Sequence, residues 1–515
     1  MLDADTHAVL PGVTIRLLQL PGGTTSQANG AFSLPLPASA AADTLLLSRI
    51  GYTRLAVALH DNPGAQPQRF FLKKQPVVLP PVAVHGAKLV ERNYGVTRQK
   101  ALVHFTDGTI RPGEAFEIAQ LIRLDHPTTN LTSVNLFLAA SLPDSARVVI
   151  HFYGFDGQRP THELGPPALA RRVAIRAGWL RVDLPALRSA LPQDFVLGLA
   201  FAPTNGSIPY EIKLGGGAKS FARTAHAADW RVPPHHYRLY VTALVPSTAA
   251  PSRLSELDNQ ETPPTARLYA AAVQDSFLLY VRLPKGYRAA QKQRYPVIFL
   301  LDANAYFDAI GPDLNNLPPA ILVGIGYQDA RLMDSLRQRD YTYPVASPAD
   351  SFSVSGGGQR FLTFLTQQVL PYVDQHYHTD PRNRTLMGHS LGGYFVLYAL
   401  AEGLRTQVPA FAHYVAASPS LYYGNDYLRR VVAALPTPTT PLPAQTLLLT
   451  AGSRELERGD AESYAFKAAF SAYEQALAGK FPSVTLKSTI YPNDGHLETA
   501  IRTFVDGWQE AYRPR

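Results

Sequence analysis

The sequence predicts a multidomain chain in which two N-terminal all-β sandwich domains precede an α/β domain. Up to about residue 245 the chain contains many short strand-like runs separated by turns. From Pro246 to Pro264 it is rich in proline, serine, threonine and charge, as linkers are. Beyond that stretch, apolar strand-sized runs occur with strong helix-forming segments. At 515 residues the chain is too long for one compact domain. We expect domains at 1–90, 91–245 and 265–515, with a linker at 246–264.

The first domain is expected to be a small β-sandwich. Strand-like runs are separated by glycine-containing turns, with strands at 13–18, 31–36 and 44–48 and turns at 21–23 and 29–30. The region resembles the carboxypeptidase-regulatory-like domain in its opening Asp5-Thr6 through Ile15, in Gly30-Ala31-Phe32 and in Ile50-Gly51-Tyr52. A zinc carboxypeptidase itself would need a spacing such as H-x-x-E, and no histidine here has a glutamate three residues on.

Residues 91–245 predict a second sandwich of jelly-roll type, with strands at 134–138, 147–153 and 195–199. The region loosely resembles accessory domains of Bacteroidetes-type surface proteins. Carbohydrate binding through Tyr153, Trp179 or Trp230 is one interpretation of its aromatic residues. We favour the other, a buried aromatic core, because aromatics dominate ordinary cores.

The segment Gly388-His389-Ser390-Leu391-Gly392 carries the strongest functional signal. It follows the strand-like run 384–387 and precedes strong helix-forming residues at 393–400. In this G-x-S-x-G pattern a serine sits on a tight strand-to-helix turn, where small flanking residues avoid clashes. The C-terminal domain is therefore expected to be an α/β-hydrolase with Ser390 as nucleophile.

A serine nucleophile needs a base and an acid, which follow in the order serine, acid, histidine in such folds. Strands at 413–418, 446–450 and 484–491 continue the expected sheet. His496 follows the last strand and is the expected general base, while Glu455 follows the strand at 446–450 and is the favoured acid. Glu457, Asp460 and Asp494 remain competitors for the same role. The oxyanion hole is expected to use the backbone N–H of Leu391 and a second donor from the loop after the strand at 295–301.

From about residue 265 to the end, the chain resembles the esterase family of α/β-hydrolases that includes enterochelin, feruloyl and acetyl xylan esterases, S-formylglutathione hydrolases and mycolyltransferase antigens. The resemblance is carried by the serine turn at 388–392, called the elbow below, and by the segment 295–302, the helix at 361–377 and the turn Ser418-Pro419-Ser420. It implies that Ser390, Glu455 and His496 form the triad.

The same resemblance assigns the second oxyanion donor to Asn304, although Ala303 replaces the family's glycine. Tyr422-Tyr423 replaces its frequent Trp-Trp, so we expect Tyr423, together with Tyr306, to contact the substrate. The family's R-x-R-D stretch corresponds to 337–340, where we favour ion pairing of Arg339 with Asp340 over contact with an acidic substrate.

Composition excludes several other classes of function. The chain has no cysteine, so disulfides and thiolate metal sites are absent. His376 and His378 would share one face of a strand, but no third ligand stands out, so we expect neither metal nor cofactor. No apolar run approaches the roughly 18 residues of a transmembrane helix. The 48 lysines and arginines against 40 acidic residues form no basic run interleaved with aromatics, so no nucleic-acid partner is expected. The sequence leaves the oligomeric state open.

We interpret the protein as a serine carboxylic-ester hydrolase acting through an acyl-enzyme on Ser390, with an acylated carbohydrate or siderophore ester as substrate. An acyltransferase with the same triad, or a surface binding protein with an inactive hydrolase domain, are the alternatives. In the family that the N-terminal domain resembles, a further strand usually precedes the aspartate, and exported members carry a signal peptide before it. This sequence begins Met1-Leu2-Asp3-Ala4-Asp5 and shows neither. We therefore expect the sequence to be N-terminally incomplete, or to start at a misassigned methionine, and the native protein to be periplasmic, secreted or on the cell surface.

Overall fold

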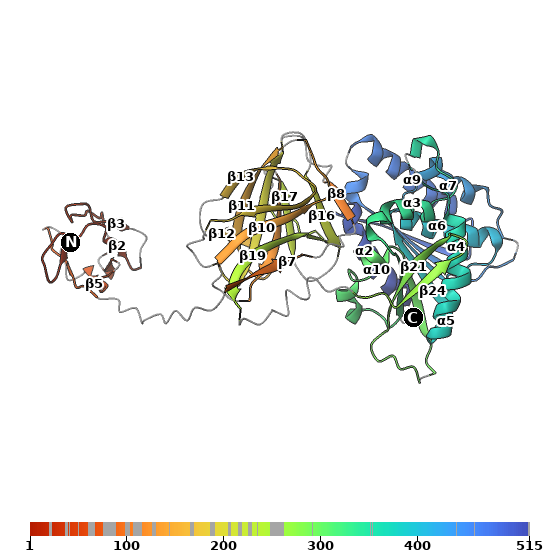
Figure 1. Ribbon diagram of the computed structural model, residues 1–515, viewed down its shortest axis with the longest axis horizontal. Coiled ribbons are helices and arrows are strands. Elements are labelled where there is room, and N and C mark those ends of the chain that lie inside the picture. The colour runs from red at the N-terminus through yellow and green to blue at the C-terminus, as the bar shows by residue number, and fades with distance from the viewer. Residues whose placement is uncertain are drawn as a thin grey trace. The chain divides into compact units, whose positions relative to one another are not determined.

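The chain divides into two compact units, Met1–Ala87 and Lys88–Arg515, in the computed structural model (Figure 1). The structure describes residues 1–512 except 20–22, 37–39, 41, 50, 60–66, 76–88, 98–102, 107–115, 126–129, 144, 165–168, 186–190, 204–207, 215–218, 225–228, 234, 248–261, 291, 351, 353, 439 and 458. Most of the expected linker at 246–264 therefore lies outside the described residues.

The first unit contains a four-stranded sheet and a separate pair of strands. The sheet has the order β3 (Gly23–Thr25), β2 (Thr14–Leu17), β4 (Thr44–Ser48) and β5 (Leu55–Ala58), and β1 (Leu2–Asp3) pairs with β6 (Phe71–Leu72). Alternate residues of β2 and β4 enter a small apolar core, because successive strand residues point to opposite faces.

Two of the three strands predicted for this unit, 13–18 and 44–48, are confirmed as β2 and β4. The strand predicted at 31–36 is wrong, because these residues form no strand. Pro35 lacks the N–H that a sheet ladder requires. The predicted turn at 21–23 begins outside the described residues, and Gly23 belongs to β3. The predicted turn at Asn29-Gly30 is present, and Gly30 has a φ of 74°.

Residues 89–246 form two larger sheets that share one apolar core. One sheet contains β7 (Leu89–Gly95), β8 (Val103–Thr106), β10 (Asn130–Leu138), β14 (Gly178–Asp183), β16 (Pro209–Leu214), β18 (His235–Tyr237) and β19 (Leu239–Pro246). The other contains β9 (Phe116–Arg123), β11 (Ser145–Phe155), β12 (Pro160–Glu163), β13 (Leu169–Ala174), β15 (Asp194–Pro203) and β17 (Ser220–Thr224). The three strands predicted here are confirmed within β10, β11 and β15.

The three aromatic residues considered for carbohydrate binding pack against other side chains. Tyr153 is 6% exposed and donates a hydrogen bond to Glu117 at 2.8 Å. The ring of Trp230 packs edge-on against Tyr153 and lies 4.1 Å from the Arg223 guanidinium carbon. Trp179 packs edge-on against two neighbouring aromatic rings. For Tyr153, the buried-core interpretation agrees with these contacts.

The C-terminal domain is built on one eight-stranded sheet. Its strands, in spatial order, are β20 (Ala266–Ala270), β21 (Asp275–Arg282), β23 (Ile321–Tyr327), β22 (Tyr295–Leu300), β24 (Thr379–His389), β25 (His413–Ala417), β26 (Gln445–Gly452) and β27 (Val484–Tyr491). Neighbouring strands from β23 to β27 pair in parallel. The β20–β21 and β21–β23 pairs are antiparallel. The strands that sequence predicted at 295–301, 384–387, 413–418, 446–450 and 484–491 are confirmed.

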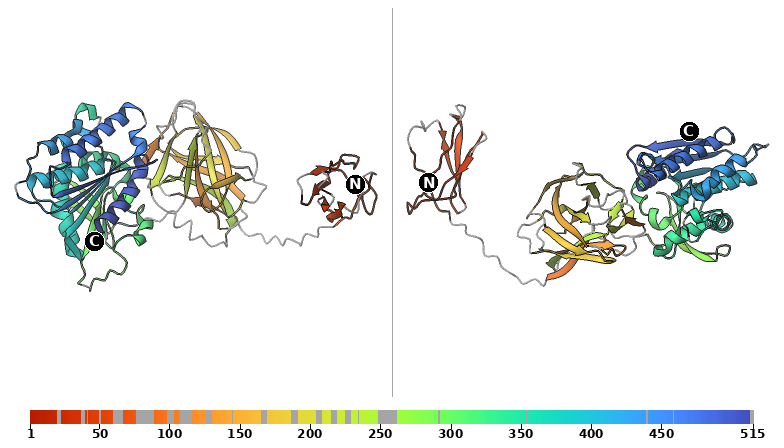
Figure 2. Two further views of the ribbon diagram at one scale, coloured as in Figure 1. Left: turned by 180° about the vertical axis from the view of Figure 1, so that it is seen from behind. Right: turned by 90° about the horizontal axis from the view of Figure 1, so that it is seen from above.

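Helices cover both faces of this sheet, as Figure 2 shows from two further directions. They are α2 (Ala303–Tyr306), α3 (Met333–Tyr341), α4 (Gly358–Phe364), α5 (Leu370–His376), α6 (Leu391–Thr406), α7 (Tyr423–Ala434), α8 (Ser453–Leu456), α9 (Ala461–Leu477) and α10 (His496–Tyr512). Short 3₁₀ turns lie at Gly311–Asn316, Ala330–Leu332 and Pro348–Asp350, and a π-helical turn at Leu365–Val369 joins α4 to α5. Helix α6 packs on β24 and β25, whereas α10 packs on β24, β25 and β26.

The carboxyl ends of parallel strands lie along the same edge of a sheet. Active sites of open α/β sheets form at that edge. After β22 the chain adds β23 on one side of it and then β24 on the other side. The loops after β22 and β24 therefore lie side by side. Among the described residues, no helix is long and apolar enough to cross a membrane.

Candidate active site

Ser390 occupies the turn between β24 and α6. Its backbone has φ 58° and ψ −118°, a conformation that residues with a Cβ rarely adopt. The turn is held because the Ser390 N–H donates to the Ala417 carbonyl at 2.9 Å. A Cβ at Gly388 would lie 2.4 Å from the Gly392 carbonyl oxygen, so the tight turn excludes a side chain there. The strained turn places the serine at the carboxyl edge of the sheet.

His496 and Glu455 meet at the same edge. His496 is the first residue of α10, and Glu455 lies in α8, directly after β26. The distance between His496 Nδ1 and Glu455 Oε2 is 2.6 Å. A carboxylate only accepts hydrogen bonds, so Nδ1 carries the proton and the lone pair of the neutral ring is on Nε2. That is the state a general base requires.

Glu455 is held by hydrogen bonds on its other oxygen as well. Its Oε1 accepts from the Ser418 hydroxyl at 2.6 Å and from the Gly452 N–H at 2.8 Å. Burial raises the pKa of Glu455, but the hydrogen bonds from His496, Ser418 and Gly452 outweigh it and leave the pKa below its ordinary value. Ser418 belongs to the Ser-Pro-Ser turn, and sequence reasoning had assigned it no role.

The three competing carboxylates lie in other surroundings. Asp460 accepts from the Ser463 N–H at 2.8 Å and caps α9. Asp494 forms an ion pair with Arg502 at 3.2 Å. Glu457 is exposed. Of the four candidates, Glu455 is the one bonded to His496.

Leu391 and Asn304, the expected oxyanion donors, both lie in first helical turns. Leu391 opens α6 and Asn304 is the second residue of α2. The first N–H groups of a helix have no acceptor within it and can bind an anion. The Asn304 side chain also fixes α2 to β23, since its Oδ1 accepts from the Tyr327 N–H at 2.6 Å and its Nδ2 donates to the Tyr327 carbonyl at 2.9 Å. The left-handed residue of this loop is Asp302, with φ 54°, so no glycine is required at Ala303.

A buried ion pair connects this loop to the elbow. Arg337 Nη2 lies 2.9 Å from Asp302 Oδ2 and donates to the His389 carbonyl at 3.0 Å. The predicted pairing of Arg339 with Asp340 is confirmed at 2.8 Å. Sequence reasoning had given Arg337 no role, although it lies in the same R-x-R-D stretch.

Tyr423 and Tyr306, the two expected substrate contacts, are both buried. Tyr423 is 1% exposed and donates to the Pro344 carbonyl at 2.8 Å, while Tyr306 is 3% exposed and bonds to His389. The exposed aromatic here is Tyr422, at 48%. Left-handed residues at 424–426 change the direction of the chain after this pair, so sequence could not show which ring is buried.

The expectation that His376 and His378 share one face of a strand is wrong. His376 ends α5, and His378 lies between α5 and β24. The His376 ring bonds to the Tyr372 carbonyl at 2.7 Å and the His378 ring to the Ala289 carbonyl at 2.6 Å. Among the residues that the structure describes, no cluster of three or more potential ligands could hold a metal ion.

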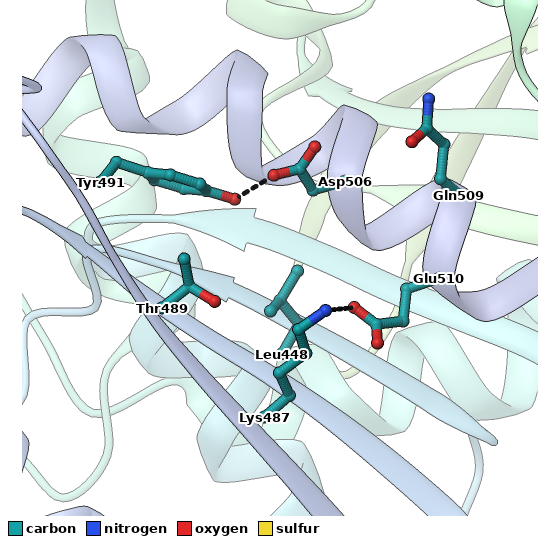
Figure 3. Close-up of a pocket in the computed structure, with 7 residues that line it drawn as sticks. All are labelled: Leu448, Lys487, Thr489, Tyr491, Asp506, Gln509 and Glu510. Atoms are coloured by element: carbon teal, nitrogen blue, oxygen red, sulfur yellow. Dashed lines mark hydrogen bonds and ion pairs between the residues drawn. The ribbon is translucent and has the colours of Figure 1, made fainter.

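A cavity of about 300 Å³ lies between β27 and α10 (Figure 3). Four of its polar side chains are paired, since Lys487 pairs with Glu510 at 2.5 Å and Tyr491 donates to Asp506 at 2.6 Å. Ser390, Glu455 and His496 do not line it. We assign it no role in catalysis.

The family described as Putative esterase matches residues 270–477, a segment that contains Ser390 and Glu455. Over these residues the C-terminal domain is similar to that family. Curated relatives include the ferri-bacillibactin esterase BesA of Bacillus subtilis (strain 168), 35% identical over 150 residues, covering 26% of this chain and 50% of the relative. The apo-salmochelin esterase of Escherichia coli O6:H1 is 34% identical over 155 residues, covering 28% of this chain and 47% of the relative.

The siderophore enterobactin esterase of Emericella nidulans is 31% identical over 187 residues, covering 31% of this chain and 57% of the relative. The chain thus spans about half the length of the curated relatives that it matches. Among solved structures, that of the BES protein from Bacillus cereus has a TM-score of 0.41 at 23% identity and covers 50% of this chain and 98% of its own.

Proposed function

We propose that the protein is a serine carboxylic-ester hydrolase in which Ser390 is the nucleophile, His496 the general base and Glu455 the acid of a catalytic triad. The observation that carries the proposal is the 2.6 Å contact between His496 Nδ1 and Glu455 at the same sheet edge as the strained serine turn. The match of residues 270–477 to the family described as Putative esterase supports ester chemistry.

In the proposed mechanism, Ser390 Oγ attacks the ester carbonyl while its proton passes to His496 Nε2. Glu455 stabilises the imidazolium, and the N–H groups of Leu391 and Asn304 donate to the oxyanion. Collapse of the tetrahedral intermediate expels the alcohol, which takes the proton from His496. Water then attacks the acyl-enzyme, with His496 again accepting its proton, and releases the acid and free Ser390.

We further propose that the substrate is a siderophore ester. The named activities of the relatives support this choice, since two act on ferri-bacillibactin and apo-salmochelin by name. Tyr422, exposed beside the Ser-Pro-Ser turn, would offer an aromatic surface to the acyl or aryl group. The sequence also suggested an acylated carbohydrate as substrate. Both substrate classes should therefore be tested in the same assay.

The deciding experiment compares the wild-type protein with Ser390→Ala on short-chain p-nitrophenyl esters, ferri-bacillibactin and an acetylated polysaccharide. We expect turnover by the wild type and loss of at least about 10³-fold in the variant, because only the oxyanion hole and binding remain. Ser471→Ala, at an exposed position of α9, is the matched control and should leave turnover unchanged. A folded Ser390→Ala protein that retains wild-type turnover would refute the assignment. Transfer of the acyl group to an added alcohol in preference to water would make the protein an acyltransferase.

A further inference from the structure

His389, the residue before the nucleophile, is buried and bonded at both ring nitrogens. It is 3% exposed. Its Nδ1 lies 2.8 Å from the Tyr306 hydroxyl, and its Nε2 lies 2.7 Å from the backbone carbonyl oxygen of His496. The mechanism proposed above uses neither contact, yet one of them ends on the residue that acts as general base.

The two contacts define the protonation state of His389. A carbonyl oxygen only accepts, so Nε2 must carry a proton. In the neutral ring Nδ1 is then an acceptor, and the Tyr306 hydroxyl donates to it. Burial, and next the proximity of His496, lower the pKa of His389 well below its ordinary value, which agrees with a neutral ring. The hydrogen bonds therefore run in one direction, from Tyr306 through His389 to His496.

This chain of hydrogen bonds joins the three segments that carry the proposed machinery. Tyr306 ends α2, which contains Asn304. His389 is part of the elbow, and His496 opens α10. The rings of His389 and His496 are also in contact, with centroids 4.5 Å apart and planes at 50°. Movement of the base relative to the nucleophile would therefore break a partly buried hydrogen bond and disturb a ring contact.

We propose that His389 is a positioning residue that holds His496 against the elbow in the place required for proton transfer from Ser390, and that Tyr306 fixes the His389 ring for this purpose. The inference rests on the proposed esterase function. It differs from a purely structural role for a buried histidine, which would affect stability without affecting turnover by the folded enzyme.

Two substitutions at His389 separate these roles. His389→Leu keeps an apolar side chain of similar bulk and removes both hydrogen bonds, whereas His389→Gln keeps one donor and one acceptor. We expect His389→Leu to lower kcat by about 10²-fold, since a displacement near 1 Å costs that much, while KM changes by less than about two-fold. His389→Gln should recover most of the lost kcat.

Tyr306→Phe tests the same chain of hydrogen bonds without altering His389. It removes only the hydroxyl, and we expect a fall in kcat of about ten-fold with KM unchanged. Tyr394→Phe is the matched control, because Tyr394 is equally buried and its hydroxyl donates to the Tyr343 carbonyl at 2.7 Å. It should cost similar stability and leave kcat unchanged. Tyr306→Phe also keeps the test valid if His389→Leu fails to fold.

The measurements are kcat and KM on a p-nitrophenyl ester and the rate of Ser390 labelling by a fluorophosphonate, each for folded protein checked by thermal melting. Loss of kcat in His389→Leu and Tyr306→Phe, with recovery in His389→Gln, supports the proposal. Wild-type kcat in Tyr306→Phe and in every folded His389 variant would overturn it while leaving the esterase function intact. A wild-type protein that neither turns over esters nor is labelled would overturn the esterase function and this inference together.

Discussion

The carboxylate of Glu455 accepts hydrogen bonds on both oxygens, from His496 on one and from Ser418 and Gly452 on the other. These bonds fix both the position of the carboxylate and its charge. A fixed anion next to Nδ1 selects the tautomer that leaves Nε2 free for the Ser390 proton. Catalysis at neutral pH is therefore expected to depend on Glu455 through the orientation and charge of His496.

Replacing Glu455 by glutamine should lower kcat by about 10²- to 10⁴-fold with little change in KM, because the amide cannot stabilise the imidazolium and can favour the wrong tautomer. Steady-state kinetics on a p-nitrophenyl ester measures this effect. Glu457→Gln, two residues further on and exposed, is the control and should behave as wild type. An equal loss in both variants would assign the acid's role elsewhere.

The lowered pKa of Glu455 also predicts how stability varies with pH. The pKa of the folded state lies below that of the unfolded chain, so the ionised carboxylate stabilises the fold above its ordinary pKa. That contribution is lost as the pH falls through the lowered pKa. The difference in Tm between wild type and Glu455→Gln should therefore shrink between about pH 7 and pH 3. A difference that stays constant over this range would contradict the assigned direction.

Among the elements, the turn from β24 to α6 has tight steric limits. The backbone passes so close to itself that the Gly388 position has no room for a Cβ, with the Gly392 carbonyl 2.4 Å away. The contact is with backbone, which cannot rotate out of the way as a side-chain end can. The sequence pattern of small residues around the serine thus has a direct steric cause.

Gly388→Ala should destabilise the protein by about 1–3 kcal/mol and impair turnover, since the turn must open to relieve the clash. Thermal melting and kinetics together report the two effects. Gly311→Ala is the comparison, because its Cβ would meet the end of the Arg282 side chain at 3.0 Å, and that side chain can move. A Gly388→Ala protein with wild-type Tm and kcat would show that the turn can open to admit a Cβ at no cost.

At the scale of the whole molecule, the proposed machinery is confined to the second unit. Every residue assigned a catalytic or positioning role lies between Asp302 and His496, within the unit Lys88–Arg515. The first unit has its own apolar core. Its contribution is therefore expected to concern binding or placement of the protein more than the chemical step.

A protein shortened to begin at Lys88 should retain kcat and KM on a small soluble ester within about two-fold, because compact units with separate cores fold as separate units. Kinetics on p-nitrophenyl acetate tests this, with Ser390→Ala in the shortened chain as the negative control. If the shortened protein folds but loses most of its kcat, the first unit takes part in forming the active site.

The sequence by itself predicted the order of strand, serine turn and helix around Ser390. It also predicted a histidine, His496, after the last strand. These features depend on contiguous residues, such as the glycines around Ser390 and the apolar runs of the sheet, and local sterics and burial decide them. The prediction of a strand at 31–36 was wrong, because an apolar run forms a strand only where another strand lies beside it to pair with.

Only the tertiary structure decided which carboxylate meets His496, which of Tyr422 and Tyr423 is exposed, and that His389 bonds to the carbonyl of His496. The partners in the first and last of these contacts are 41 and 107 residues apart in the chain, so no local pattern relates them. They depend on how loops from different strands converge at one edge of the sheet. That convergence is a property of the folded sheet, so the sequence predicts the candidate residues and only the fold shows which of them are in contact.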